Sequence, residues 1–484
     1  MTDKSLIGLL EGTGAVCVGS DDVIVSGVAY RSDRVRPGEA FFCIPGFAFD
    51  GHDFARDAVA NGAAALVVER KIDKLEAPQF IVSDTRVALA LASARAEDEP
   101  SRAMAVVGIT GTNGKTTTTY LLDAIMREAS MTTGLIGTVE TRVAGERLSS
   151  SRTTPESSDL ERLLARMRDA GVEGVAMEVS SHAIDLHRVD GVHFAVVAFT
   201  NLTQDHLDYH HTLEEYASVK RRLFTDFDSD ARVVNVDDEY GARIAAETEG
   251  ALTVGRHASA MVRAEDEELG SAGARFTLIT PAGSSRVDLP LAGAYNVSNA
   301  LLAAGCALSL GIPLETVVRG LEAAPQVPGR LERVEAGQQF SVIVDYAHTP
   351  DSLEKAIRAV KDVTAGRVIV VFGCGGDRDP DKRPLMGAAV AANADLAIIT
   401  SDNPRSEDPV GIILQVEDGV RGSELCYEVE VDRRRAIARA IALASAGDAV
   451  LVAGKGHEDY QIFADRTVHF DDREVAREEL AVRC

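Results

Sequence analysis

The chain has 484 residues, 45% of them hydrophobic, and a formal net charge of −25 at pH 7. This length exceeds what one hydrophobic core supports, so roughly three domains are expected. The negative charge would repel a nucleic-acid backbone and an anionic membrane surface, so neither is expected as a partner. The six cysteines show no CxxC spacing, which indicates free thiols. Neither a signal-peptide core nor a stretch of about twenty apolar residues is present, so we expect a cytoplasmic protein without membrane insertion.

The first hundred residues combine short predicted strands with one predicted helix, which indicates a small α/β domain. A polar segment at 97–103 that contains Pro100 is expected to be a linker to the next domain. The strands are predicted within 22–30, 39–44, 64–69 and 79–84, and the helix within 51–63.

A glycine-rich motif, GITGTNGKTTT at 108–118, follows a predicted buried strand and opens an amphipathic helix. Gly111 and Gly114 allow the backbone to turn so that its N–H groups point at a phosphate. The Lys115 ammonium could then bridge the outer phosphates, and the Thr116 hydroxyl could hold Mg²⁺. The motif therefore predicts a P-loop, and with it a nucleoside triphosphate as substrate.

Beyond the P-loop, strands and helices alternate, which indicates a parallel sheet covered by helices. Glu178 follows one of these strands, and Asp205 and His206 follow the next. Carboxylate and imidazole groups at strand ends beside a P-loop suit Mg²⁺ bound to phosphate, although helix capping is the alternative for each residue alone. Lys220 lies among like charges on a predicted helix at 213–224, a pattern that by itself favours a solvated surface position.

Residues 329–484 repeat the alternation of strand and helix, which predicts another, doubly wound α/β domain with its loops at the strand C-termini. Several loops combine glycine or proline with charge, although ordinary turns are the alternative for each loop alone. Arg405 could clamp a carboxylate, and Glu458 could receive an ammonium group. The loops read DYAHTPDSL (345–353), FGCGGDRDPDKRP (372–384), SDNPRSEDP (401–409) and GKGHEDYQ (454–461).

These motifs resemble those of the Mur ligases over essentially the whole chain. Within that family they are most similar to the tripeptide synthetases, in which DNPR accompanies selection of meso-diaminopimelate. The resemblance implies a UDP-substrate-binding domain at 1–100, a P-loop ATPase-like parallel-sheet domain at 101–328, and a Rossmann-like domain at 329–484 that binds the incoming amino acid and closes on the nucleotide. Further motifs that carry the resemblance are EVSSHAIDLHRVDG, TNLTQDHLDYH and LAGAYNVSNALLAA.

The implied activity is that of an ATP-dependent amide ligase of peptidoglycan precursor synthesis. It would add meso-diaminopimelate to UDP-N-acetylmuramoyl-L-alanyl-D-glutamate through an acyl phosphate, because a carboxylate resists attack by an amine until it is activated. ATP would be a co-substrate and Mg²⁺ the cofactor. A monomer that acts on small molecules is expected.

The resemblance also assigns roles to individual residues. Lys115, Lys220 and His206 would be catalytic, and Lys220 would be a carbamate, which reverses the solvated reading of its helix. Mg²⁺ would be held by Thr116, Glu178, His206 and the Lys220 carbamate. ATP would contact Gly111, Thr112, Asn113, Gly114, Lys115, Thr116, Thr117, Asn296, Asn299, Arg330, Asp345 and His348; the UDP-substrate Tyr30, Ser32, Phe47, Ala48, Phe49, Arg152, Thr153, Thr154, Ser180, Leu186 and Arg188; and meso-diaminopimelate Arg378, Asp402, Asn403, Pro404, Arg405, Gly454 and Glu458.

Three other functions remain open at this point. The same chemistry with L-lysine is disfavoured by Arg405, which suits a distal carboxylate that lysine lacks. A folylpolyglutamate synthetase shares the P-loop style, but the full first domain and DNPRSEDP argue against it. A P-loop switch without ligase activity would hydrolyse ATP independently of the two acceptor substrates.

Overall fold

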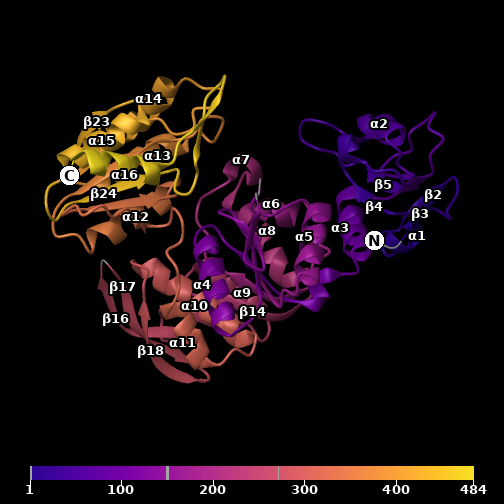
Figure 1. The fold of residues 1–484 in the computed structure, drawn as a ribbon, viewed down its shortest axis with the longest axis horizontal. Coiled ribbons are helices and arrows are strands. Elements are labelled where there is room, and N and C mark those ends of the chain that lie inside the picture. Colours follow the sequence, from indigo (N-terminus) through magenta and orange to yellow (C-terminus); the bar gives the residue numbers. More distant parts are fainter. Residues whose placement is uncertain (1–2, 149–151, 271, 484) are drawn as a thin grey trace.

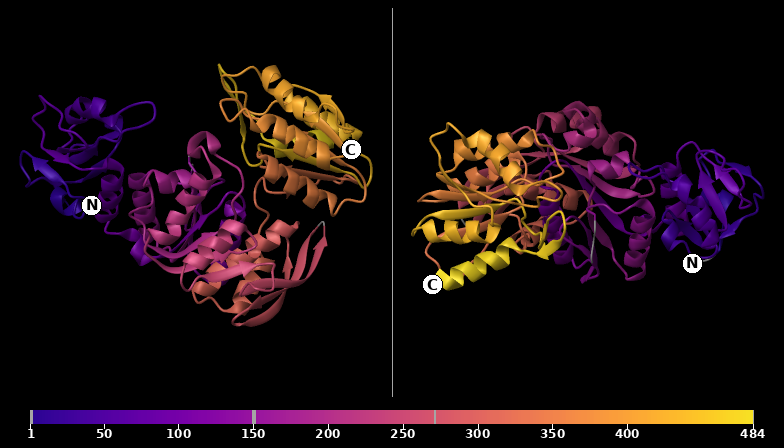
Figure 2. Two further views of the ribbon diagram at one scale, coloured as in Figure 1. Left: turned by 180° about the vertical axis from the view of Figure 1, so that it is seen from behind. Right: turned by 90° about the horizontal axis from the view of Figure 1, so that it is seen from above.

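The computed structural model describes residues 3–148, 152–270 and 272–483, which form three α/β parts in chain order (Figure 1). The N-terminal and C-terminal parts lie on opposite sides of the middle part, as the further views confirm (Figure 2). Within the described residues, no helix is both long and apolar enough to cross a membrane.

The N-terminal part contains a five-stranded sheet in the order β2-β7-β6-β5-β4, in which β4 to β7 are parallel and β2 is antiparallel to β7. Helix α3, at residues 85–96, was not predicted, and residues 97–103 form in part the 3₁₀ helix η3 rather than an irregular linker. The elements are β1 (Lys4–Ser5), α1 (Leu6–Leu9), β2 (Val16–Val18), β3 (Ile24–Val25), β4 (Gly27–Ala29), η1 (Ser32–Arg34), β5 (Glu39–Phe42), η2 (Gly51–Phe54), α2 (Ala55–Ala60), β6 (Ala65–Val68), β7 (Gln79–Ile81), α3 (Thr85–Ala96) and η3 (Pro100–Ala103).

The middle part has an 11-stranded sheet in the order β11-β10-β9-β12-β8-β13-β14-β15-β16-β17-β18. Strands β9 to β16 of this order are parallel as predicted, whereas β10, β11, β17 and β18 add antiparallel edges. Helices α4, α10 and α11 cover one face of the sheet, and α5, α6, α8 and α9 cover the other. The elements are β8 (Ala105–Thr110), α4 (Lys115–Glu128), β9 (Thr133–Ile136), β10 (Thr141–Val143), β11 (Glu146–Leu148), α5 (Ser157–Asp169), β12 (Gly174–Glu178), α6 (Ser181–Asp185), β13 (Phe194–Phe199), α7 (Leu207–His210), α8 (Leu213–Thr225), β14 (Ser229–Asn235), α9 (Glu239–Glu247), β15 (Leu252–Gly255), β16 (Val262–Gly270), β17 (Gly273–Thr280), β18 (Gly283–Leu289), α10 (Ala294–Ser309) and α11 (Leu314–Glu322).

The C-terminal part is doubly wound, as predicted, around a sheet in the order β19-β20-β24-β21-β22-β23. Strands β20 to β24 are parallel and β19 is antiparallel to β20. One face carries α12, α13 and the unpredicted α14, and the other carries α15 and α16. The elements are β19 (Glu332–Arg333), β20 (Ser341–Asp345), α12 (Pro350–Lys361), β21 (Val368–Phe372), α13 (Lys382–Asn393), β22 (Leu396–Ile399), α14 (Pro409–Val420), β23 (Cys426–Val429), α15 (Arg433–Leu443), β24 (Ala449–Ala453), β25 (Tyr460–Ile462), β26 (Thr467–His469) and α16 (Asp472–Arg483).

Candidate active site

The P-loop connects the end of β8 to the start of α4. Gly111 has φ +141°, and a Cβ there would lie 1.8 Å from Oγ1 of Thr200. Gly114 has φ +86°, and a Cβ there would lie 2.3 Å from Oδ1 of Asn299. Both positions require glycine, because the backbone conformation and the close neighbours exclude a side chain. The turn leaves the N-terminus of α4 available to an anion.

Two lysines converge on one carbonyl group of the P-loop. Nζ of Lys115 donates to the carbonyl oxygens of Gly111 and Thr112 over 2.9 and 2.8 Å. Nζ of Lys220, from α8, donates to the same Gly111 oxygen over 2.8 Å and lies 4.4 Å from the ring centroid of Tyr216. Burial lowers the pKa of both lysines, and Lys220 is only 1% exposed. The solvated position that the helix pattern favoured for Lys220 is therefore wrong.

Thr116 and Glu178 place oxygen atoms beside the P-loop. Oγ1 of Thr116 donates to Oε1 of Glu178 over 3.0 Å and accepts from the Arg330 guanidinium over 3.2 Å. Hydroxyl and carboxylate oxygens are ligands that Mg²⁺ prefers, so this pair fits such an ion. In the described part of the chain, no three His, Cys, Asp or Glu side chains approach closely enough to form a metal site by themselves. Phosphate oxygens or a modified side chain would have to complete the coordination.

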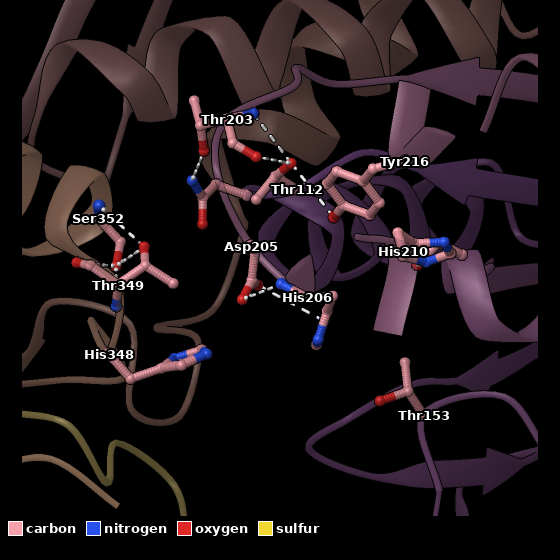
Figure 3. A network of polar contacts seen from close by, with 12 residues as sticks. Thr112, Thr153, Thr203, Asp205, His206, His210, Tyr216, His348, Thr349 and Ser352 are labelled. Carbon is pink, nitrogen blue, oxygen red and sulfur yellow. Dashed lines mark hydrogen bonds and ion pairs between the residues drawn. The ribbon is translucent and has the colours of Figure 1, made fainter. Parts of the chain in front are cut away.

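His206 follows β13, with Nε2 3.5 Å from Oδ2 of Asp205. Its ring makes an edge contact with His182 at a centroid distance of 5.0 Å. Burial lowers the pKa of His206, which favours the neutral imidazole that can act as a metal ligand. Asp205 and His206 face His348 across the space between the middle and C-terminal parts (Figure 3).

A cavity of about 710 Å³ adjoins the P-loop between these two parts. Nδ2 of Asn299 donates to Oδ1 of Asn296 over 3.1 Å, and Asn296 in turn donates to the Ala292 carbonyl, so Asn296 holds Asn299 in place. On the opposite side, the Arg330 guanidinium lies 4.6 Å from the ring centroid of Tyr346. The predicted ATP-binding residues that line the cavity are Asn113, Gly114, Thr117, Asn299, Arg330, Asp345 and His348.

Asp345 and Asn113 fix the two sides of this cavity. The Asp345 carboxylate accepts from the backbone N–H groups of Leu331 and Ala347 over 2.7 and 2.8 Å, which shapes the turn after β20. Nδ2 of Asn113 donates to Oδ2 of Asp351 over 3.0 Å, which joins the P-loop to the N-terminus of α12. The cavity beside the P-loop is therefore built by both parts.

A second cavity, of about 700 Å³, also lies between the middle and C-terminal parts. His348 lines both cavities, so the two are neighbours. Most residues predicted to bind the amino acid meet residues of the middle part here. The middle part contributes Arg152, Thr153, Asp205 and His206, and the C-terminal part contributes Arg378, Asp402, Asn403, Arg405, Gly454 and Glu458.

Arg405, in the loop after β22, and Arg383, in the first turn of α13, have different surroundings. Arg405 has φ +52°, and its guanidinium donates to the Gly376 carbonyl over 2.6 Å. A Cβ at Gly375 would lie 2.9 Å from the same guanidinium. Within the described residues Arg405 forms no ion pair, whereas Arg383 is 1% exposed and binds Glu407 over 2.8 Å. Arg405 thus brings to the second cavity a guanidinium that no described carboxylate pairs with, whereas the Arg383 guanidinium is taken up by Glu407.

Glu458 is held by two neighbours. Its Oε2 accepts from Nδ2 of Asn403 over 2.9 Å and from Nζ of Lys455 over 3.2 Å. Lys455 is fully buried and also donates to Oδ1 of Asn403 over 3.1 Å. A Cβ at Gly454 would lie 2.6 Å from Oδ2 of Asp402, so glycine allows this approach. Lys455 was not predicted as a site residue, although the GKGHEDYQ motif contains it.

The loop that carries Glu458 also packs against the start of the C-terminal part. Gly329 has φ +65°, and a Cβ there would lie 2.1 Å from the backbone nitrogen of His457. The His457 ring lies 5.1 Å from the Tyr346 ring centroid, and burial lowers its pKa to about 3. His457 lines the second cavity and was not predicted from the sequence.

The residues predicted to meet the UDP-substrate fall into two groups. In the N-terminal part, the Tyr30 hydroxyl donates to Asp159 of α5 over 2.8 Å. Phe47 and Phe49 are 82% and 73% exposed, and Phe47 makes an edge contact with Tyr209 at a centroid distance of 5.7 Å. Both contacts reach the middle part. Also in this group are Ser32, at the start of η1, and Ala48, between the two phenylalanines.

In the second group, which lies in the middle part, two arginines flank Glu156. Its carboxylate lies 3.3 Å from Nε of Arg188 and 3.6 Å from a guanidinium nitrogen of Arg152. The Thr154 hydroxyl donates to the main-chain oxygen of Glu178 over 2.9 Å, which ties this group to the P-loop side. Ser180 and Leu186 cap the two ends of α6.

Three stretches of the chain match domains of a single family. Residues 24–103 match the Mur ligase family catalytic domain, 109–307 the Mur ligase middle domain, and 329–456 the Mur ligase glutamate ligase domain. The chain therefore belongs to the Mur ligase family and is a ligase enzyme. The predicted family and α/β fold class are confirmed.

Similar proteins carry a more specific name. UDP-N-acetylmuramoyl-L-alanyl-D-glutamate–2,6-diaminopimelate ligase of Bacillus licheniformis is 45% identical over 467 residues, 95% of each chain. The protein of the same name from Geobacillus kaustophilus is 47% identical over 468 residues, again 95% of each chain. A solved structure with this name has 30% identity and a TM-score of 0.72, covering 100% of this chain and 99% of the other.

Proposed function

We propose that this ligase adds meso-diaminopimelate to UDP-N-acetylmuramoyl-L-alanyl-D-glutamate, with ATP cleaved to ADP and phosphate, in cytoplasmic peptidoglycan precursor synthesis. The observation that carries the proposal is the second cavity, in which Arg405 and Glu458 face Thr153 and His206. The names of the similar proteins support the same reaction. A monomer with domains at 1–100, 101–328 and 329–484 is part of the proposal.

In the first step, an oxygen of the D-glutamate carboxylate attacks the γ-phosphorus of ATP, which gives an acyl phosphate and ADP. Lys115 and the N-terminus of α4 offset the charge on the phosphoryl oxygens. Thr116, Glu178, His206 and a carbamate on Lys220 would hold Mg²⁺, which when bound neutralises phosphate charge as a Lewis acid. The lowered pKa of Lys220 supports the carbamate, because only a neutral amine adds to CO₂.

In the second step, the amino group of meso-diaminopimelate attacks the acyl carbon. Phosphate leaves the tetrahedral intermediate, and the nitrogen loses its extra proton to give the amide. Arg405 binds the distal carboxylate and Glu458 an ammonium group of the amino acid, while Arg378, Asp402 and Asn403 complete the pocket. L-Lysine would leave the Arg405 charge unpaired, which is the basis of selectivity.

The test is phosphate release from ATP with Mg²⁺ and UDP-N-acetylmuramoyl-L-alanyl-D-glutamate. The amino acid would be meso-diaminopimelate, L-lysine or none, and the tripeptide product would be identified by mass. Release that requires meso-diaminopimelate is the expected result. Release with L-lysine would keep the ligase reaction and reject the specificity, and equal release without an amino acid would reject ligation.

A further inference from the structure

We propose that Thr138 is a positioning residue that fixes the Glu178 carboxylate as a Mg²⁺ ligand and connects it to the second cavity. The inference deepens the proposed function, because it assumes that Glu178 holds Mg²⁺ there. Thr138 lies in the turn between β9 and β10 and lines the second cavity. No sequence motif discussed above contains it.

Both oxygens of the Glu178 carboxylate are held by this turn. The backbone N–H of Thr138 donates to Oε1 over 2.8 Å, and its hydroxyl donates to Oε2 over 3.1 Å. Thr116 donates to Oε1 from the other side over 3.0 Å. A Cβ at Gly137 would lie only 2.6 Å from Oε1, so glycine lets the turn approach the carboxylate. Glu178, which is 1% exposed, is therefore held in one orientation before any ion binds.

The Thr138 hydroxyl also contacts Thr153, with 2.9 Å between the two hydroxyl oxygens. A hydroxyl carries a single proton, so a Thr138 hydroxyl that donates to Glu178 must accept from Thr153. The resulting chain runs from Thr153 through Thr138 to Glu178. Since Thr153 lines the second cavity, an acceptor peptide bound there would act on the Glu178 carboxylate through the hydroxyl groups of Thr153 and Thr138.

The variants that test this role are Thr138→Val, which removes the hydroxyl at nearly constant volume, and Thr138→Ser, which keeps it. Thr277→Val is the matched control, because its hydroxyl contacts only the exposed Asp266 carboxylate, on β16, over 3.4 Å in the described structure. The first readout is binding of Mn²⁺ in the presence of ADP, followed by electron paramagnetic resonance. The second is the Mg²⁺ dependence of phosphate release.

Thr138→Val should weaken Mn²⁺ binding by about 10-fold, the lower end of the effect of residues that hydrogen-bond a metal ligand. It should also raise the Mg²⁺ concentration for half-maximal phosphate release. Thr138→Ser should restore both values, and Thr277→Val should change neither. A merely structural role would lower the melting temperature and kcat while metal affinity stayed at the wild-type value, and that result would overturn the inference.

The Mn²⁺ measurement separates this inference from the proposed reaction. If wild-type protein releases no phosphate with meso-diaminopimelate but Thr138→Val still weakens Mn²⁺ binding, the proposed reaction fails and the role of Thr138 stands. If the reaction occurs and all variants bind Mn²⁺ equally, the role of Thr138 fails and the reaction stands.

Discussion

Lys220 donates to the carbonyl oxygen of Gly111 over 2.8 Å, the same oxygen that accepts from Lys115 over 2.9 Å. Two ammonium groups thus meet at one P-loop carbonyl, and within the described residues neither forms an ion pair. Burial of this kind is costly for a cation unless its charge is removed or compensated. Burial therefore favours the neutral amine form of Lys220, which is the form that adds to CO₂ to give a carbamate.

Replacement of Lys220 by alanine should reduce phosphate release by about 100-fold or more, because a group that stabilises transferring phosphoryl charge is lost. Added bicarbonate should not restore activity. With ¹³C-bicarbonate, a carbamate carbon signal should appear in wild-type protein and be missing in the variant. Arg221→Ala, an exposed change on the same helix, is the control. Unimpaired turnover of Lys220→Ala would remove this residue from the mechanism.

Arg405→Ala should lower kcat/KM for meso-diaminopimelate by about 100-fold or more, because the distal carboxylate would lose its partner. Most of the effect should fall on KM, measured by phosphate release at varied amino-acid concentration. The exposed Arg421 supplies a control in Arg421→Ala. An unchanged KM for meso-diaminopimelate would show that another group reads the distal carboxylate.

Gly114→Ala should weaken ADP binding by at least about 10-fold, because its Cβ would meet Asn299 at 2.3 Å and its φ is +86°. Isothermal titration calorimetry would measure the change. Gly145→Ala is a matched control, since Gly145 has φ +91° but nothing within 4 Å of its Cβ position. Equal loss of ADP binding in both variants would point to general backbone strain rather than to the P-loop.

Glu161→Gln should stabilise the protein at alkaline pH. Glu161 is 1% exposed where α5 packs against α3, and burial raises its pKa from 4.5 to about 8. The folded state therefore retains a proton that the unfolded state releases above pH 4.5, so wild-type stability falls between pH 4.5 and 8. Glutamine removes this dependence.

The expected gain for Glu161→Gln is roughly 1–3 kcal/mol at pH 8 and above, shrinking toward zero below pH 5. Melting temperatures across this pH range would measure it, with the exposed Glu214→Gln as control. A gain that is equal at acidic and alkaline pH would contradict the assigned cause.

The P-loop could be predicted because glycine, lysine and threonine at fixed spacing have few structural alternatives. The strand-end loops could be located because each follows a predicted strand, although each alone is also compatible with an ordinary turn. Helix α3 could not, because its sequence TRVALALASARA is apolar nearly all round and shows no exposed face. The position of Lys220 could not be predicted for a different reason. Its charged helix pattern favoured a solvated side chain, whereas the ammonium group is buried and donates to the Gly111 carbonyl of the P-loop. Thr138 carries no sequence signal, since its role arises from a turn that meets Glu178 only in the folded sheet.

Gly329, near the border between the middle and C-terminal parts, packs against a loop that lines the second cavity. Since the backbone there touches the chain at His457, any larger residue would push the loop that carries Glu458. A larger residue at Gly329 should therefore raise the KM for the amino acid proposed to bind beside Glu458, under conditions in which the protein is still folded. The backbone at the border of the two parts and the loop that carries Glu458 therefore depend on each other's position.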